Sequence, residues 1–338
     1  MTLVPLFRVI CGATAVLGPR EYGLTAPGPC SQLGNINQRR LLNLTNPAGA
    51  GTVIGTMTNM DDGGTQRYNG LLLTATWRKQ NVNISGNYTW SHCYGLPYTT
   101  VANIGAAYTH EQYQNNGPVD RKIDYGDCVV GNLDQRHIAN ITAVVNTGRG
   151  SGNSWARHLT SGWSISTIYT VRSGWPVTPY LSTDRAVNGL FANAGGYQIA
   201  QRPDQVLVDT ASPTRGQSCT PAPCVSWLNP AAFALPNVGA YGNMGTGSVR
   251  APGFWEWDQA IIREFKVTEG QRVEFRAEAF NVTNSVRFYM NPAPNGDNST
   301  RFGTAQFGTI FQAASTTGST SLSGAGGRVL QFALKYVF

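Results

Sequence analysis

Apolar and polar residues alternate with a period of two in several parts of the chain, most clearly in the last ten residues. One face of the segment 329–338 is apolar throughout, and it consists of Leu330, Phe332, Leu334, Tyr336 and Phe338. The opposite face carries Lys335. Such alternation predicts a β-strand with one face in an apolar environment. If that environment is lipid, the reversed register would place Lys335 in the bilayer at a cost of about 2–4 kcal/mol, so the register is well specified.

Five further segments show this alternation, and a sixth strand is expected around residues 256–266. The five segments cover residues 71–78, 81–90, 139–145, 163–172 and 272–279. In the last of these segments the polar face is a ladder of alternating charges, formed by Arg272, Glu274, Arg276 and Glu278. Together with Lys335, this ladder would line the interior of a barrel. Neighbouring opposite charges mainly pair with one another, so we expect the ladder to stiffen the wall, with contact to a plug or a solute as the alternative.

Short and long connections alternate between the expected strands. The connections at 78–80, 147–156 and 267–270 are short or moderate, whereas the loops at 91–135, 173–254 and 284–327 are long. Outer-membrane barrels have short periplasmic turns and long extracellular loops. If every long loop is placed outside, the C-terminal Phe338 lies on the periplasmic side. The sequence therefore predicts an all-β fold, an antiparallel transmembrane β-barrel with long extracellular loops.

The strand count indicates part of a larger barrel. About seven or eight strands are expected, whereas single-chain bacterial barrels use an even number. An open sheet edge in lipid would leave backbone groups without hydrogen-bond partners, so we expect further strands upstream of a truncated start. Residues 1–18 lack the basic region of a signal peptide and carry Arg8 in their middle. We predict that residues 1–67 are a loop-rich N-terminal segment, an extracellular loop of the truncated barrel, and that residues 68–338 hold the barrel strands and loops.

Composition narrows the class of protein. Charged residues make up 13% of the chain, compared with roughly 25% in typical soluble domains. Since no apolar run approaches the roughly 18 residues of a membrane helix, a membrane would be crossed by strands. The net charge of +7 is spread along the chain, which disfavours nucleic-acid binding. A soluble β-sandwich is the alternative, but aromatic residues near strand ends, Trp77, Trp90 and Trp163, favour the interfacial girdles of a barrel.

All six cysteines lie in the expected loops. A disulfide between Cys219 and Cys224 would close a short Pro-rich loop, and one between Cys93 and Cys128 would tie a long loop together. Zinc is the competing interpretation, but no second close cysteine pair or His-x-His accompanies them. The four histidines show no ligand spacing and no Gly-x-Ser-x-Gly motif occurs. We therefore predict no catalytic residues, no cofactor and no metal, and hence no enzyme.

Short motifs follow one another between Asn35 and Phe338. They include Asn69-Gly-Leu, Tyr88-Thr-Trp-Ser91, Asp134-Gln-Arg-His137, Ser173-Gly-Trp-Pro176, Asn229-Pro-Ala-Ala-Phe233, Tyr241-Gly-Asn243, Arg250-Ala-Pro-Gly-Phe-Trp255 and Phe275-Arg-Ala-Glu-Ala-Phe-Asn281. Their order and spacing resemble the C-terminal part of the barrel of Oar-like TonB-dependent receptors, which are outer-membrane transporters.

That resemblance implies uptake of an unidentified solute across the outer membrane of a Gram-negative-type bacterium. It also implies partners: outer-membrane lipid, the missing upstream strands with a plug domain, TonB, and the barrel assembly machinery, which reads a terminal strand such as that ending in Phe338. The alternative function is a surface adhesin or assembly protein that uses its long loops without transport.

Overall fold

The computed structural model describes residues 65–95, 125–128, 134–148, 160–187, 201–290, 298–315, 318–321 and 327–338, with Trp155 and short pieces within residues 10–49. These short pieces include β1 (Ile10–Cys11), β2 (Gly28–Pro29), two 3-10 turns (Leu33–Asn35 and Asn37–Arg39) and the helix α1 (Leu41–Thr45). No described helix is long and apolar enough to span a membrane.

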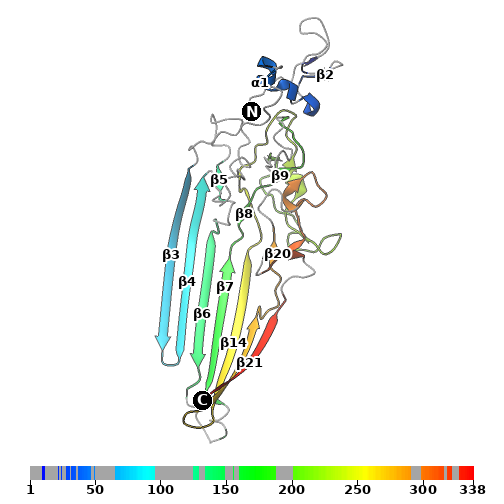
Figure 1. Ribbon diagram of the computed structural model, residues 1–338. Coiled ribbons are helices and arrows are strands. Elements are labelled where there is room, and N and C mark those ends of the chain that lie inside the picture. The colour runs from blue at the N-terminus through cyan, green and yellow to red at the C-terminus, as the bar shows by residue number, and fades with distance from the viewer. Residues whose placement is uncertain are drawn as a thin grey trace.

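Seven long strands dominate the fold, and they confirm the predicted antiparallel architecture. They are β3 (Gln66–Lys79), β4 (Val82–Gly95), β6 (His137–Asn146), β7 (Trp163–Arg172), β14 (Phe254–Lys266), β15 (Arg272–Phe280) and β21 (Val329–Val337). Each pairs antiparallel with its neighbour in the order β21-β15-β14-β7-β6-β4-β3, and the two-residue strand β5 (Gly126–Asp127) pairs with the end of β4. Among the described strands the sheet is open, with β3 and β21 at its edges (Figure 1).

The register aligns the alternation of each strand with that of the next, which gives the whole sheet two distinct faces. One row of directly opposed residues runs through Phe332, Ala277, Ile261, Ile165, Val145 and Val82. We call the face that carries this row the apolar face. Its side chains are well exposed within the isolated chain, for example Phe332 at 68% and Leu334 at 74%. Such a surface is costly in water and suited to lipid.

The apolar face carries Arg67 and Lys79 at the two ends of β3, and Arg263 on β14. The guanidinium carbon of Arg263 lies 4.8 Å from the ring centroid of Trp163 and 4.6 Å from that of Phe265. All three residues lie close to the short turns of the sheet, where a membrane interface would be. Aromatic rings can cover the stem and charge of an arginine there, so Arg263 is consistent with a lipid-facing surface.

The connections sort to the two ends of the sheet as the loop lengths predicted. The links β4–β6, β7–β14 and β15–β21 lie at one end, and the C terminus lies at the other (Figure 1). At the loop end, described residues from 173–253 and 281–328 fold together, and we call them the loop module. Its short strands pair between the two loops: β11 (Val225–Ser226) with β18 (Thr309–Ile310), and β9 (Tyr180–Leu181) with β17 (Arg301–Phe302) in parallel.

Further pairs complete the module. They are β8 (Pro176–Val177) with β13 (Val249–Arg250), β10 (Asp204–Gln205) with β12 (Phe233–Ala234), and β16 (Phe288–Tyr289) with β19 (Gln312–Ser315), which also pairs with β20 (Gly318–Ser321). Two 3-10 turns, Pro230–Ala232 and Asn298–Thr300, lie beside them. The sequence predicts only loops in these stretches, because two-residue strands are too short to show a period.

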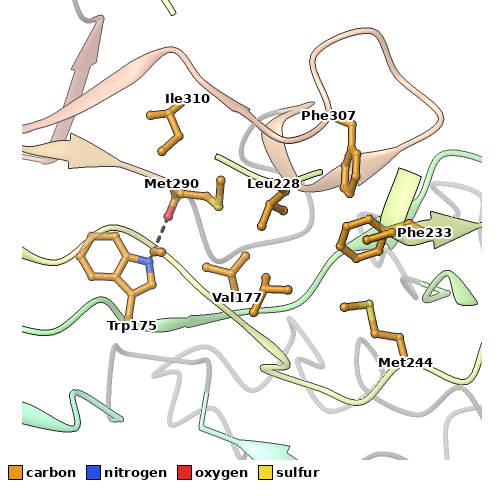
Figure 2. Packing of buried hydrophobic residues seen from close by; sticks show 11 residues of the cluster. Trp175, Val177, Leu228, Phe233, Met244, Met290, Phe307 and Ile310 are labelled. Carbon is orange, nitrogen blue, oxygen red and sulfur yellow. Dashed lines mark hydrogen bonds between the residues drawn. The ribbon is translucent and has the colours of Figure 1, made fainter. Parts of the chain in front are cut away.

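The loop module has its own hydrophobic core (Figure 2). Phe233 packs against Phe302 and Phe307, with ring centroids 6.1 and 5.0 Å away. The buried Trp175 donates a hydrogen bond from Nε1 to the carbonyl oxygen of Met290, 3.0 Å away. Because burial of a large apolar side chain contributes about 1.5–3 kcal/mol, this cluster holds the two long loops together.

Candidate functional site

The face opposite the apolar face is lined by polar side chains, and we call it the polar wall. On β4, β6 and β7 it carries amides and hydroxyls. These are Asn83, Ser85, Asn87, Thr89, Asn140, Thr142, Ser164, Ser166 and Thr170. We call this set the neutral half of the polar wall.

Hydrogen bonds connect the neutral half across three strands. Asn140 Nδ2 donates to Asn87 Oδ1 at 2.9 Å, and Thr170 Oγ1 donates to Asn140 Oδ1 at 3.0 Å. These three side chains come from β6, β4 and β7, so the register alone brings them side by side. The wall is therefore an ordered polar surface.

The remaining strands form the charged half of the polar wall. It comprises Glu256, Asp258, Glu264 and Lys266 of β14, the ladder residues Arg272, Glu274, Arg276 and Glu278 of β15, and Lys335 of β21. The register thus brings all five predicted ladder residues onto one face, with Lys335 directly opposite Glu274.

The ion pairing in the ladder differs in one respect from a purely cross-strand arrangement. Arg276 Nη2 lies 2.6 Å from Glu278 Oε1, so this pair runs along β15 rather than across strands. Glu274 lies opposite Glu264 on one side and opposite Lys335 on the other. Stiffening of the wall by the ladder, rather than contact with a solute, remains a prediction.

The loop module touches the charged half near the outer end of β14. Arg287 forms an ion pair with Glu256. Asp258 Oδ1 accepts a hydrogen bond from the backbone N–H of Asn281 at 2.9 Å. The buried Asn281 has a φ of 52° and its Oδ1 accepts from the backbone N–H of Ser285 at 3.0 Å. This turn directs the loop after β15 back over the polar wall.

A second contact between the sheet and the loop module is a network of charged side chains. We call it the junction cluster, and it consists of His92, Asp127, Asp134, Arg136 and Arg250. Arg250 comes from β13 of the loop module, whereas the others lie at the outer ends of β4 and β6 and on β5. The guanidinium group of Arg250 contacts the carboxylates of Asp127 and Asp134. Arg136 bridges the same two carboxylates, with Nη2 3.0 Å from Asp127 Oδ2 and Nε 3.1 Å from Asp134 Oδ2.

Asp134 is the fully buried centre of this cluster. Burial alone would raise the pKa of its carboxyl group. Hydrogen bonds from the backbone N–H of Cys93 and from Arg250, the charge of Arg250, and a hydrogen bond from Arg136 outweigh burial and lower that pKa below its ordinary value. The carboxylate therefore stays charged and holds the two arginines.

Three members of the cluster have a spacing that could suit a cation. Ligand atoms of His92, Asp127 and Asp134 lie within 4.8 Å of one another, although the sequence predicted no metal site. Both carboxylates are already bound by guanidinium groups, whose charges would repel a cation. We therefore interpret the cluster as an ion-pair junction.

Disulfides stand beside the junction cluster and in the loop module. The structure joins Cys93 to Cys128 and Cys219 to Cys224, the two pairings that the loop spacing indicated. The side-chain amide of Gln66 lies 2.8 Å from the sulfur of Cys93 and 3.1 Å from that of Cys128. The first disulfide therefore fixes Asp127, which precedes Cys128, next to the end of β4.

Comparison with known proteins places the chain in a family. A family model described as an outer membrane beta barrel domain matches residues 13–331. No curated protein gives a significant match. The matched region covers nearly the whole chain, so the protein belongs to this outer-membrane β-barrel family and resides in the outer membrane.

Proposed function

We propose that this outer-membrane barrel protein forms part of the wall of an Oar-like TonB-dependent receptor and takes part in uptake of a solute. The observation that carries the proposal is a transmembrane sheet with one lipid-suited face and one continuous polar wall, whose outer end bears a folded loop module in contact with that wall. A wall of this kind suits passage of a polar solute. The proposal assigns no catalytic step to the chain.

The directions of the two edge strands decide how many further strands would close the sheet into a barrel. β3 and β21 both run from the loop end of the sheet to the end that carries the C terminus (Figure 1). Antiparallel closure therefore needs an odd number of additional strands between them. In the proposed receptor these strands, with the plug, come from the upstream part of the same protein.

TonB and the barrel assembly machinery enter the proposal through the resemblance of the sequence motifs. The terminal strand supports a role in assembly, because its lipid-suited side chains continue to Phe338, which is 91% exposed. An exposed aromatic residue at the end of an edge strand is accessible to an assembly factor before the barrel closes.

A surface adhesin is the second candidate function. It is favoured by the rim of the loop module, where residues 213–218 and 220–223 are exposed around the Cys219–Cys224 disulfide. A disulfide-closed loop of this kind could contact another surface without any solute passing the barrel.

Solute depletion by living cells separates the two candidates. Strains with and without the gene would be grown in defined medium, and solutes remaining in the medium would be followed by mass spectrometry, with and without an uncoupler of the proton-motive force. Uptake predicts at least one solute whose depletion slows without the gene and depends on that force. Unchanged depletion together with reduced attachment to surfaces would support the adhesin and contradict transport.

A further inference from the structure

We infer that the neutral half of the polar wall is a contact surface for an uncharged, hydroxyl-rich solute of the oligosaccharide class. This inference rests on the proposed uptake function and specifies its substrate class. Four observations support it: the absence of charge along the middle of these strands, the unused hydrogen-bonding capacity of the amides, exposed apolar side chains on the same wall, and the balance of charges beside them.

Charge is absent over a wide part of the wall. On β3, β4, β6 and β7, charged side chains occupy polar-wall positions only at strand ends, with Arg78 beside the short turn after β3 and Arg172 at the loop end of β7. The positions between these ends carry no charged side chain. An ionic solute that left water here would lose hydration without meeting an opposite charge. An uncharged solute does not face that cost.

The amide side chains can form further hydrogen bonds. An asparagine offers two N–H donors and a carbonyl oxygen with two lone pairs. The described contacts use one N–H and one lone pair of Asn140, and one lone pair of Asn87. Donors and acceptors therefore remain for a ligand, and sugar hydroxyls both donate and accept. Exchange of hydrogen bonds with water for hydrogen bonds with these groups gives a small net gain in free energy for each bond.

Apolar side chains interrupt the same wall. Ile168 and Leu72 lie on it and are 48% and 66% exposed. A sugar ring combines hydroxyl groups with apolar C–H surface, so it can pack against these side chains while it hydrogen-bonds to the amides. A small inorganic ion has no surface that would use them.

The charged half supplies little attraction for a net charge. Arg276 pairs with Glu278, Arg287 pairs with Glu256, and Lys335 lies opposite Glu274. The remaining acids, Asp258 and Glu264, are matched in number by Lys266 and Arg272. Because these opposite charges compensate one another locally, they do not concentrate a solute of either sign along the wall.

Binding of two matched oligosaccharides tests the inference. The full chain would be purified from outer membranes in detergent and examined by saturation-transfer NMR with maltohexaose, which is neutral, and with hexagalacturonate, which is acidic and of equal length. We expect binding of maltohexaose and much weaker binding of hexagalacturonate. No binding of maltohexaose, or equal binding of both, would overturn the inference.

Two double variants locate the contact. Asn87→Leu with Asn140→Leu removes the amides and should weaken maltohexaose binding about tenfold, the effect of roughly one to two hydrogen bonds. Arg276→Gln with Glu278→Gln changes the charged half and should leave binding unchanged. The β-sheet signal in circular dichroism, compared with that of the parent protein, verifies that both variants fold. If a folded leucine variant binds as well as the parent protein, the inference is wrong.

Failure of this inference can be distinguished from failure of the proposed uptake function. If uptake in cells depends on the gene but the solute taken up is charged, the function stands and this inference fails. If maltohexaose binds at the neutral half but uptake does not depend on the gene, the contact surface stands and the transport role fails.

Discussion

The seven-stranded sheet exposes its apolar side chains, whereas the loop module buries them. On the sheet, Phe332 and Leu334 are 68% and 74% exposed and face away from the polar wall. In the loop module, Leu181, Met290 and Ile310 have no exposed surface. One chain thus contains a region built for lipid and a region built like a soluble domain. The sheet therefore depends on the membrane for burial of its apolar surface, whereas the loop module is stabilised by a hydrophobic core of its own.

The largest expected effect comes from the core of the loop module. Phe233→Ala removes a buried ring that contacts Phe302 and Phe307, and such truncations cost about 3–5 kcal/mol. Hydrogen exchange should accelerate throughout the module, while the strands of the sheet keep their protection. The matched control Leu235→Ala alters a side chain that is 47% exposed and should have little effect. Equal loss of protection in the sheet would contradict the independence of the two regions.

The second effect concerns the lipid-suited face. Phe332→Arg should cost about 2–4 kcal/mol of folding free energy in a bilayer, because the charge would lie in hydrocarbon in the row of Ala277 and Ile261. Gln331→Arg places the same side chain on the polar wall, opposite Glu278, and should be tolerated. Urea titration of both variants in lipid vesicles measures the difference. Similar destabilisation by the two substitutions would show that the faces are wrongly assigned.

A smaller effect is expected where the two regions meet. Arg250→Met leaves the buried carboxylate of Asp134 with Arg136 as its remaining charged partner and should cost about 1–3 kcal/mol. The predicted result is faster hydrogen exchange at the start of β6 and in β13, with an intact module core. Arg250→Lys should restore part of the protection. If Arg250→Met leaves hydrogen exchange unchanged, the junction cluster does not stabilise the contact between the sheet and the loop module.

The smallest effect is the dependence of this junction on pH. The pKa of Asp134 is lowered on folding, so its stabilising contribution is fully present above the ordinary aspartate value of 3.8 and is lost as pH falls through the lower, folded-state pKa. Protection of β13 should therefore decrease in strongly acidic buffer. The Asp134→Asn variant should show less protection of β13 than the parent protein at neutral pH. Its protection should not decrease further in strongly acidic buffer. An identical acid response in the variant would assign the titration to another group.

The sheet could be predicted from the sequence because its signals are long and repeated. Segments such as 272–279 and 329–338 alternate over at least eight residues, and the register then follows from the need to keep Lys335 out of lipid. The alternation within 272–279 likewise predicts that the ladder residues share one face. The pairing of β15 with β21 agrees with this placement. Long strands that face lipid on one side leave a clear period-two signal.

The loop module and the junction cluster left no comparable signal. Strands of two residues such as β11 and β18 show no period, and they pair across a long stretch of chain. Asp134 and Arg250 are separated by 116 positions. Asp134 and Arg250 each lie in one of the short sequence motifs, but nothing in the motifs indicates that the two residues are in contact. Tertiary packing of the two long loops decides these contacts.

The central claim is that the sheet crosses the membrane with its apolar face in lipid and its polar wall away from it. Spin labels at single cysteines along positions 330–336 of β21, and along β7, would be tested in vesicles for collision with oxygen and with a water-soluble nickel chelate. The account predicts that accessibility alternates with a period of two, with oxygen favoured at Phe332 and Leu334 and the chelate favoured at Gln331 and Lys335. Chelate access at both sets of positions would show that the sheet stands in water and would contradict the account.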